Sequence, residues 1–128
     1  MSAGHADALG DVLGVEQGFG HRAHVHLAWR FLQHDEEIAA QDKMRAAVRQ
    51  VAAAHGTPDK YHETLTLAWI HLVAAHVRAD PGADFETFIA RNAGLLDRSL
   101  PSRHFSSDVL QSAEARRAFV PPDLAPLP

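Results

Sequence analysis

Histidine is the residue type with the most chemical potential in this chain, which has ten histidines and no cysteine among its 128 residues. A neutral imidazole can bind a transition metal or move a proton near neutral pH. The pair His21-x-x-His24 has the spacing of neighbours on one face of a helix. The lack of cysteine excludes disulfides, thiolate zinc sites and cysteine nucleophiles.

His62 is the third candidate, because helical periodicity places it on the same apolar face as Leu65 and Trp69. If the first three main helices alternate in direction, the residues His21, His24 and His62 lie at one end of the bundle. Metal sites in helical bundles usually take ligands from more than one helix. We therefore predict that these three histidines bind one transition-metal ion (Cu, Zn, Fe or Ni) with an open coordination position.

The segment Tyr61-His62-Glu63 also permits acid–base catalysis without a metal. His62 would be the general base or acid and Tyr61 a hydroxyl donor. Glu63 lies about 100° around the helix from His62 and would be a supporting or surface group. Simpler interpretations are packing for Tyr61 and a hydrogen-bonded core position for His24 or His62 taken singly. His55 is best explained as a cation favoured at a helix C-terminus. The other histidines are interpreted as solvated or turn residues (His5, His26, His34, His71, His104) or as a core-edge residue (His76).

The elements that would position these side chains form an all-α, single-domain bundle of about four main helices plus a short C-terminal helix. Gly56 is typical of the residue after a helix end, and Thr57-Pro58 is typical of a helix start. Asp35 is a candidate N-cap. Apolar periodicity predicts the main helices at residues 21–33, 36–55, 58–79 and 84–92, and the short one at 107–118.

The two ends of the chain differ from this bundle, which we assign to residues 19–120. Residues 1–18 mix glycine, alanine and acidic residues with little periodicity, so we interpret them as a flexible N-terminal arm or a short extra helix. Residues 121–128 are rich in proline, which prevents regular secondary structure, and form a tail.

The overall composition is typical of a globular protein. Hydrophobic residues make up 46% and charged residues 22% of the chain. The formal net charge of −4 is atypical of a nucleic-acid-binding protein. No stretch approaches the about 20 apolar residues of a membrane span, and the first residues lack the positive start of a signal peptide. We therefore expect a cytoplasmic protein without nucleic-acid or membrane partners.

Several segments together resemble an uncharacterised family of small all-helical bacterial proteins. They are residues 19–25 (FGHRAHV), 52–56 (AAAHG), 60–66 (KYHETLT) and 119–123 (FVPPD), so the resemblance covers most of the chain from 19 to 123. The family has recurring F-x-H-x-x-H and K-Y-H-E-T segments. The resemblance implies a helical fold and places the three predicted ligands in recurring segments, but it implies no particular activity.

Three functions remain open from the sequence. The leading hypothesis is a small metal-dependent enzyme that acts on a small-molecule substrate through an open histidine-ligated site. The second is a metal-free lyase or isomerase that uses histidine as general acid or base. The third is a non-catalytic helical binding module.

Overall fold

The computed structural model describes residues 5–128, with side chains from Ala8 onward, and these residues form helices but no β-strand. The predicted all-α, single-domain fold is confirmed. No described helix has both the length and the apolar character needed to cross a membrane. The elements are α1 (His5–Glu16), α2 (His21–Leu32), α3 (Glu37–Ala54), α4 (Glu63–Ala79), α5 (Phe85–Arg91), α6 (Ser107–Leu110), α7 (Ala113–Arg117) and the 3-10 helices η1 (Pro58–Lys60), η2 (Ala93–Leu96) and η3 (Leu100–Arg103).

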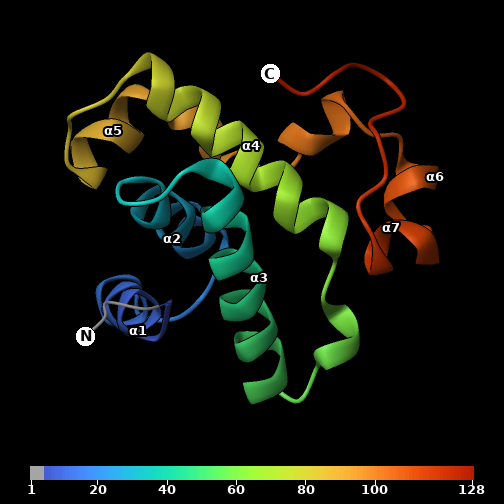
Figure 1. Ribbon diagram of the computed structural model, residues 1–128, viewed down its shortest axis with the longest axis horizontal. Helices are drawn as coiled ribbons and strands as arrows, with labels where there is room; N and C mark the ends of the chain where they lie inside the picture. The colour runs from blue at the N-terminus through green and yellow to red at the C-terminus, as the bar shows by residue number, and fades with distance from the viewer. Residues whose placement is uncertain (1–4) are drawn as a thin grey trace.

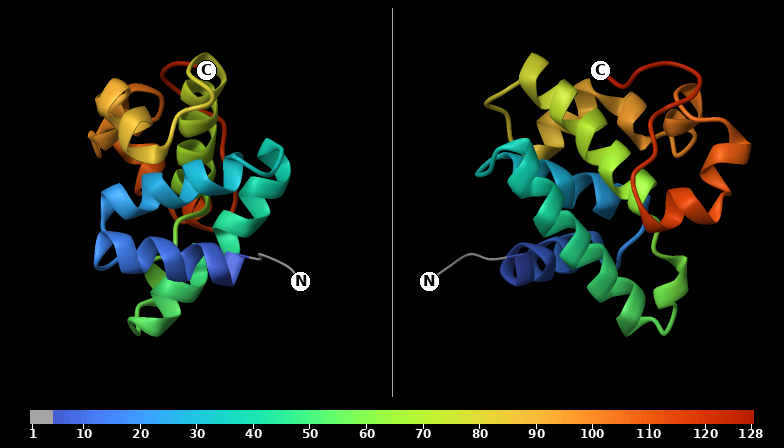
Figure 2. Two further views of the ribbon diagram at one scale, coloured as in Figure 1. Left: turned by 90° about the vertical axis from the view of Figure 1, so that its left-hand side faces the viewer. Right: turned by 45° about the vertical axis from the view of Figure 1, so that its right-hand side comes forward.

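Two crossed pairs of helices make up the centre of the molecule. The helices α3 and α4 run in opposite directions and contact each other closely (Figure 1). The helices α1 and α2 lie side by side and run across that pair (Figure 2). The C-terminal segment returns to the start of α4, where α7 packs against it (Figure 1). The start of α4 is therefore covered by the C-terminal segment.

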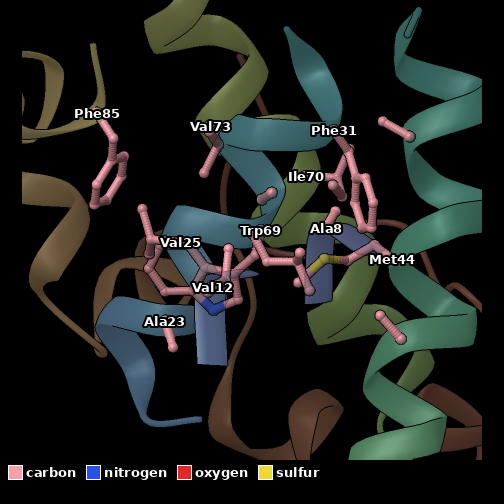
Figure 3. Close-up of a cluster of buried hydrophobic side chains, with 14 of the residues drawn as sticks. Ala8, Val12, Ala23, Val25, Phe31, Met44, Trp69, Ile70, Val73 and Phe85 are labelled. Atoms are coloured by element: carbon pink, nitrogen blue, oxygen red, sulfur yellow. The ribbon is translucent and has the colours of Figure 1, made fainter. Parts of the chain in front are cut away.

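The hydrophobic core joins residues from the first five helices. Figure 3 shows Val12, Val25, Met44, Ile70 and Phe85, one from each of α1 to α5, meeting in a single cluster. The helix α4 contributes the largest number of buried hydrophobic residues, with seven. Burial of this apolar surface is the main source of stability for the bundle.

The N-terminal segment is a helix that belongs to the core, so of the two interpretations the short extra helix is right and the flexible arm is wrong for residues 5–16. Residues 5–16 form α1, and Ala8, Leu9 and Val12 are buried against the bundle. These apolar residues share one helical face, but glycines between them obscure the pattern. Residues 1–4 of the predicted arm lie outside the described residues.

The predicted helix over residues 58–79 is interrupted before α4. Residues 58–60 form the 3-10 helix η1, the backbone at His62 is extended, and α4 begins at Glu63. The side chain of His62 caps α4, because its Nδ1 accepts a hydrogen bond from the Leu65 N–H at 3.1 Å. Thr57, the predicted cap, forms no capping hydrogen bond. Similarly, Glu36 rather than Asp35 occupies the N-cap position of α3.

The C-terminal segment contains two short helices where one was predicted over residues 107–118. Ser106 caps α6 and Ser112 caps α7, each accepting a backbone N–H three residues later. A second cap inside the segment ends the first helix and starts another. The tail after residue 120 is irregular, as predicted, and is fixed to His104, whose carbonyl accepts the Leu124 N–H at 2.9 Å.

Candidate functional site

A pocket of about 340 Å³ lies between α2, α3, η1 and α4. Its wall is mostly apolar and includes Phe19, Val51 and Trp69, while His24 and Tyr61 supply polar groups. A mostly apolar pocket with a few polar groups is typical of small-molecule binding sites. We name it the His24 pocket; its remaining lining residues are Val48, Ala52, His55, Thr57, Lys60, His62, Leu65 and Thr66.

His24 is the chemically most unusual residue of the pocket. Its Nε2 atom is buried and has no hydrogen-bond partner among the described residues. Burial lowers the pKa of His24 to about 4, with a smaller contribution from the nearby charge of His21, so the ring is neutral at pH 7. A buried polar atom without a partner costs about 1–3 kcal/mol, and native proteins have few of them. His24 therefore offers an unused hydrogen-bonding position at the pocket.

Phe19 lies over His24 at the entrance to α2. The two ring centroids are 5.7 Å apart, and Phe19 is only partly buried. The chain reaches this position through Gly18, whose φ of 130° is a conformation that side-chain-bearing residues rarely adopt. Gly18 thus lets the connection from α1 to α2 place an aromatic ring at the pocket.

His21, the second predicted ligand, is directed away from the pocket. It is the first residue of α2, its Nε2–H donates to the Leu95 carbonyl at 2.9 Å, and the ring packs edge-on against Trp69. His21 is not among the residues that line the His24 pocket. Its hydrogen bond instead attaches η2 to the start of α2.

His62, the third predicted ligand and the predicted general base, has protein partners at both ring nitrogens. Its Nδ1 accepts from the Leu65 N–H, and its Nε2–H donates to the Leu110 carbonyl at 2.7 Å. Burial lowers the pKa of His62, the bond to Leu110 opposes this effect, and the charge of Arg116 lowers the pKa further. His62 therefore joins the start of α4 to the end of α6.

The three predicted metal ligands do not surround a common point. The described residues contain no group of three His, Cys, Asp or Glu side chains placed to hold a metal ion. The structure does bring His24 and His62 to one pocket, which His55 also lines, but His21 is outside it. To coordinate a metal, His62 would have to give up one of its hydrogen bonds, because both of its ring nitrogens have partners within the protein, whereas the bond of His21 to Leu95 uses only Nε2.

Glu63 and Tyr61 form a fixed hydrogen-bonded unit beside the pocket. Glu63 is buried and accepts hydrogen bonds from Arg45 Nε and the Tyr61 hydroxyl, both at 2.6 Å. Burial raises the pKa of Tyr61 to about 12, and the bond to Glu63 acts in the same direction. The Tyr61 proton is thus already donated within the protein, and its ring is held as a wall. Glu63 is a supporting residue, as one interpretation of the sequence expected, and does not lie on the surface.

His26, which lies outside the pocket, was interpreted from the sequence as a solvated or turn residue, and this interpretation is wrong. Its side chain is only 12% exposed, its ring stacks on Phe85 at 3.9 Å, and its Nδ1 lies 2.8 Å from the buried carboxylate of Glu16. Arg22 binds the same carboxylate. The group joins α1, α2 and α5, so His26 is a structural residue and not a solvated one. His71, by contrast, is 36% exposed and pairs with Glu37 across the surface.

The pocket also contains residues that the sequence did not single out, among them Phe19, Val51 and Lys60. The glycines around Phe19 are the sequence feature that could have drawn attention to this residue. The segments with the suspected family resemblance supply His24 and Tyr61, but that resemblance stays a prediction. A comparison of the chain with known protein families, curated proteins and solved structures finds no match.

Proposed function

We propose that the protein binds a small, largely apolar molecule in the His24 pocket and recognises one polar group on it through His24. The observation that carries the proposal is the buried, unpartnered Nε2 of His24 in the wall of an apolar pocket. A ligand hydroxyl would supply the missing hydrogen bond whichever ring nitrogen of the neutral imidazole carries the proton. The aromatic rings of Phe19 and Trp69 are suited to contact a planar apolar body.

The size of the pocket restricts the ligand to a small molecule. Its volume of about 340 Å³ is at the lower end of the range of roughly 300–1,000 Å³ typical of ligand pockets. One aromatic ring with a short substituent is of suitable size. A chain terminus or a folded partner is too large for this space.

The pKa of His24 fits a role in ligand binding better than a role in general acid–base catalysis. A general base works best when its pKa is near the working pH, and the pKa of His24 is about 4. His62, the other candidate base, uses both nitrogens within the protein. The non-catalytic binding module is thus favoured over the lyase or isomerase.

The test compares 4-propylphenol with 4-propyltoluene, which have nearly the same shape but differ in one hydroxyl group. We expect the phenol to bind about fivefold more tightly, although the toluene derivative is more hydrophobic, because a neutral hydrogen bond contributes about 1 kcal/mol. The measurement is a titration followed by amide ¹H–¹⁵N spectra, with the largest shifts at pocket residues. His24→Leu should abolish the preference, and His71→Leu, on the outer face of α4, should retain it.

Equal affinity for the two compounds, or shifts confined to another face, would refute the proposal. A metal titration of untagged protein by equilibrium dialysis tests the earlier prediction separately. We expect no stoichiometric Zn²⁺ or Cu²⁺, because both ring nitrogens of His62 have partners within the protein and the described residues contain no group of three side chains placed to hold a metal ion. One bound ion that is lost in H21A, H24A and H62A but kept in H71A would replace our proposal with the metal site.

A further inference from the structure

A second hollow, which we name the arginine cleft, adjoins the His24 pocket. It has a volume of about 800 Å³ and is formed by α3, η1 and α7. Tyr61 lines both hollows, so its side chain is a shared wall. The helix α3 also contributes to both: Val48 and Val51 face the pocket, while Arg49 faces the cleft. A molecule in the pocket therefore has the cleft as its neighbour.

The cleft is strongly basic in an acidic protein. Three arginines line it, Arg49, Arg116 and Arg117, with Asp59 as its one acidic lining residue. The whole chain has 16 acidic and 12 basic residues. None of the three guanidinium groups forms an ion pair with a carboxylate of the described residues, whereas arginines elsewhere, such as Arg45, are paired. Unpaired guanidinium groups gathered in one concave site attract anions.

Two of these arginines are held in position by the walls of the cleft. The guanidinium carbon of Arg49 lies 4.5 Å from the centre of the Tyr61 ring, a cation–π contact. Arg116 Nη1 donates to the Lys60 carbonyl at 3.3 Å. The charge of Arg116 acts as far as His62, which lines the His24 pocket. The positive potential of the cleft thus extends to the pocket.

We infer that the ligand of the His24 pocket is an organic anion whose carboxylate is bound in the arginine cleft. The inference rests on the proposed function and adds the charge of the ligand and its orientation in the pocket. The polar group at one end meets His24, the apolar body fills the pocket, and the carboxylate passes Tyr61 to the arginines. Arginine is suited to this role because its planar fork binds a carboxylate through two hydrogen bonds.

The test uses 3-(4-hydroxyphenyl)propionate, which carries a carboxylate where 4-propylphenol has a methyl group. We expect the carboxylate to bind about tenfold more tightly at low ionic strength, with most of the gain lost in 0.5 M salt. Arg116→Gln and Arg117→Gln should each reduce the gain by about two- to fivefold and leave 4-propylphenol binding unchanged. Arg103→Gln is the matched control, since Arg103 is exposed and lies outside the cleft.

The outcomes separate the two proposals. If 4-propylphenol binds and the propionate binds no more tightly, the pocket stands and the inference of an anionic ligand is overturned. If neither compound binds, both proposals fail. If the propionate binds but Arg103→Gln weakens it as much as Arg116→Gln does, the gain is a general charge effect and the cleft is not the site. Arginine Nε–H resonances that shift with the propionate and not with 4-propylphenol would support the assignment.

Discussion

Acidification from pH 7 to pH 4 should lower the free energy of unfolding by roughly 3 kcal/mol through His24 alone. The pKa of His24 is about 4 in the folded protein and 6.5 without the fold, and each unit of this difference is worth about 1.4 kcal/mol. The unfolded chain therefore binds the proton first as pH falls. The stability is fully present above pH 6.5 and is lost as pH falls from 6.5 to 4. Urea denaturation at a series of pH values measures it.

Other titratable groups also change the stability with pH, some in the same pH range as His24 and some below it. The pKa of His62 is also lowered, so its protonation adds to the loss in the same direction. His21 is the titratable group whose charge acts on His24. The lowered pKa values of Asp84, Asp97 and Asp123 act only below their ordinary value of 3.8, outside this window.

His24→Leu isolates the contribution of the imidazole. At pH 7 the variant should be as stable as the native protein or more stable, because it replaces a buried atom without a partner by an apolar group. At pH 4 its relative advantage should grow by roughly 3 kcal/mol. Parallel stability curves for the native protein and His24→Leu would show that His24 is not a buried neutral ring.

An increase in stability on removal of His24 would also bear on function. A residue that costs stability is retained in natural proteins where it contributes to binding or catalysis. The missing hydrogen bond at the Nε2 atom lowers the stability of the free protein, and a ligand that supplied this hydrogen bond would compensate the loss. The stability measurement and the titration with 4-propylphenol thus examine the same atom by independent means.

Helical periodicity predicted most of the fold correctly, because an amphipathic helix records its buried face in the sequence. The predicted helices over 21–33, 36–55 and 84–92 correspond to α2, α3 and α5 within a few residues. The inward direction of His24 and His62 was also predicted. The break before α4 was not, because His62 caps the helix through its own side chain, and histidine is not a residue whose type marks a cap.

The partners of the histidines could not be predicted from their faces. A periodic pattern states which side of a helix is buried, but not which atoms from distant segments reach it. The carbonyls that bind His21 and His62 come from positions 74 and 48 residues further along the chain. Similarly, the face of α2 that carries His26 is covered by α1 and α5, and the sequence around His26 indicates neither contact. In His62 the hydrogen bonds use both ring nitrogens, so neither is left for a metal.

The substitution His62→Ala should lower the free energy of unfolding by about 2–4 kcal/mol. Loss of the N-cap of α4 contributes about 1 kcal/mol. Loss of the bond to Leu110 leaves that carbonyl without its partner and contributes about 1–3 kcal/mol. The measurement is urea denaturation at pH 7, where His62 is neutral because burial lowers its pKa.

His62→Asn distinguishes this structural role from a role in binding or catalysis. Asparagine is a strong N-cap residue, so the variant should recover about 1 kcal/mol of the loss, but its shorter side chain does not replace the bond to Leu110. Where both variants are folded, they should keep the preference for 4-propylphenol over 4-propyltoluene, because His24 supplies the recognition. An unchanged free energy of unfolding in His62→Ala, together with loss of 4-propylphenol binding, would contradict this account. In that case His62 would contact the ligand, and the capping bond to Leu65 would be incidental to its function.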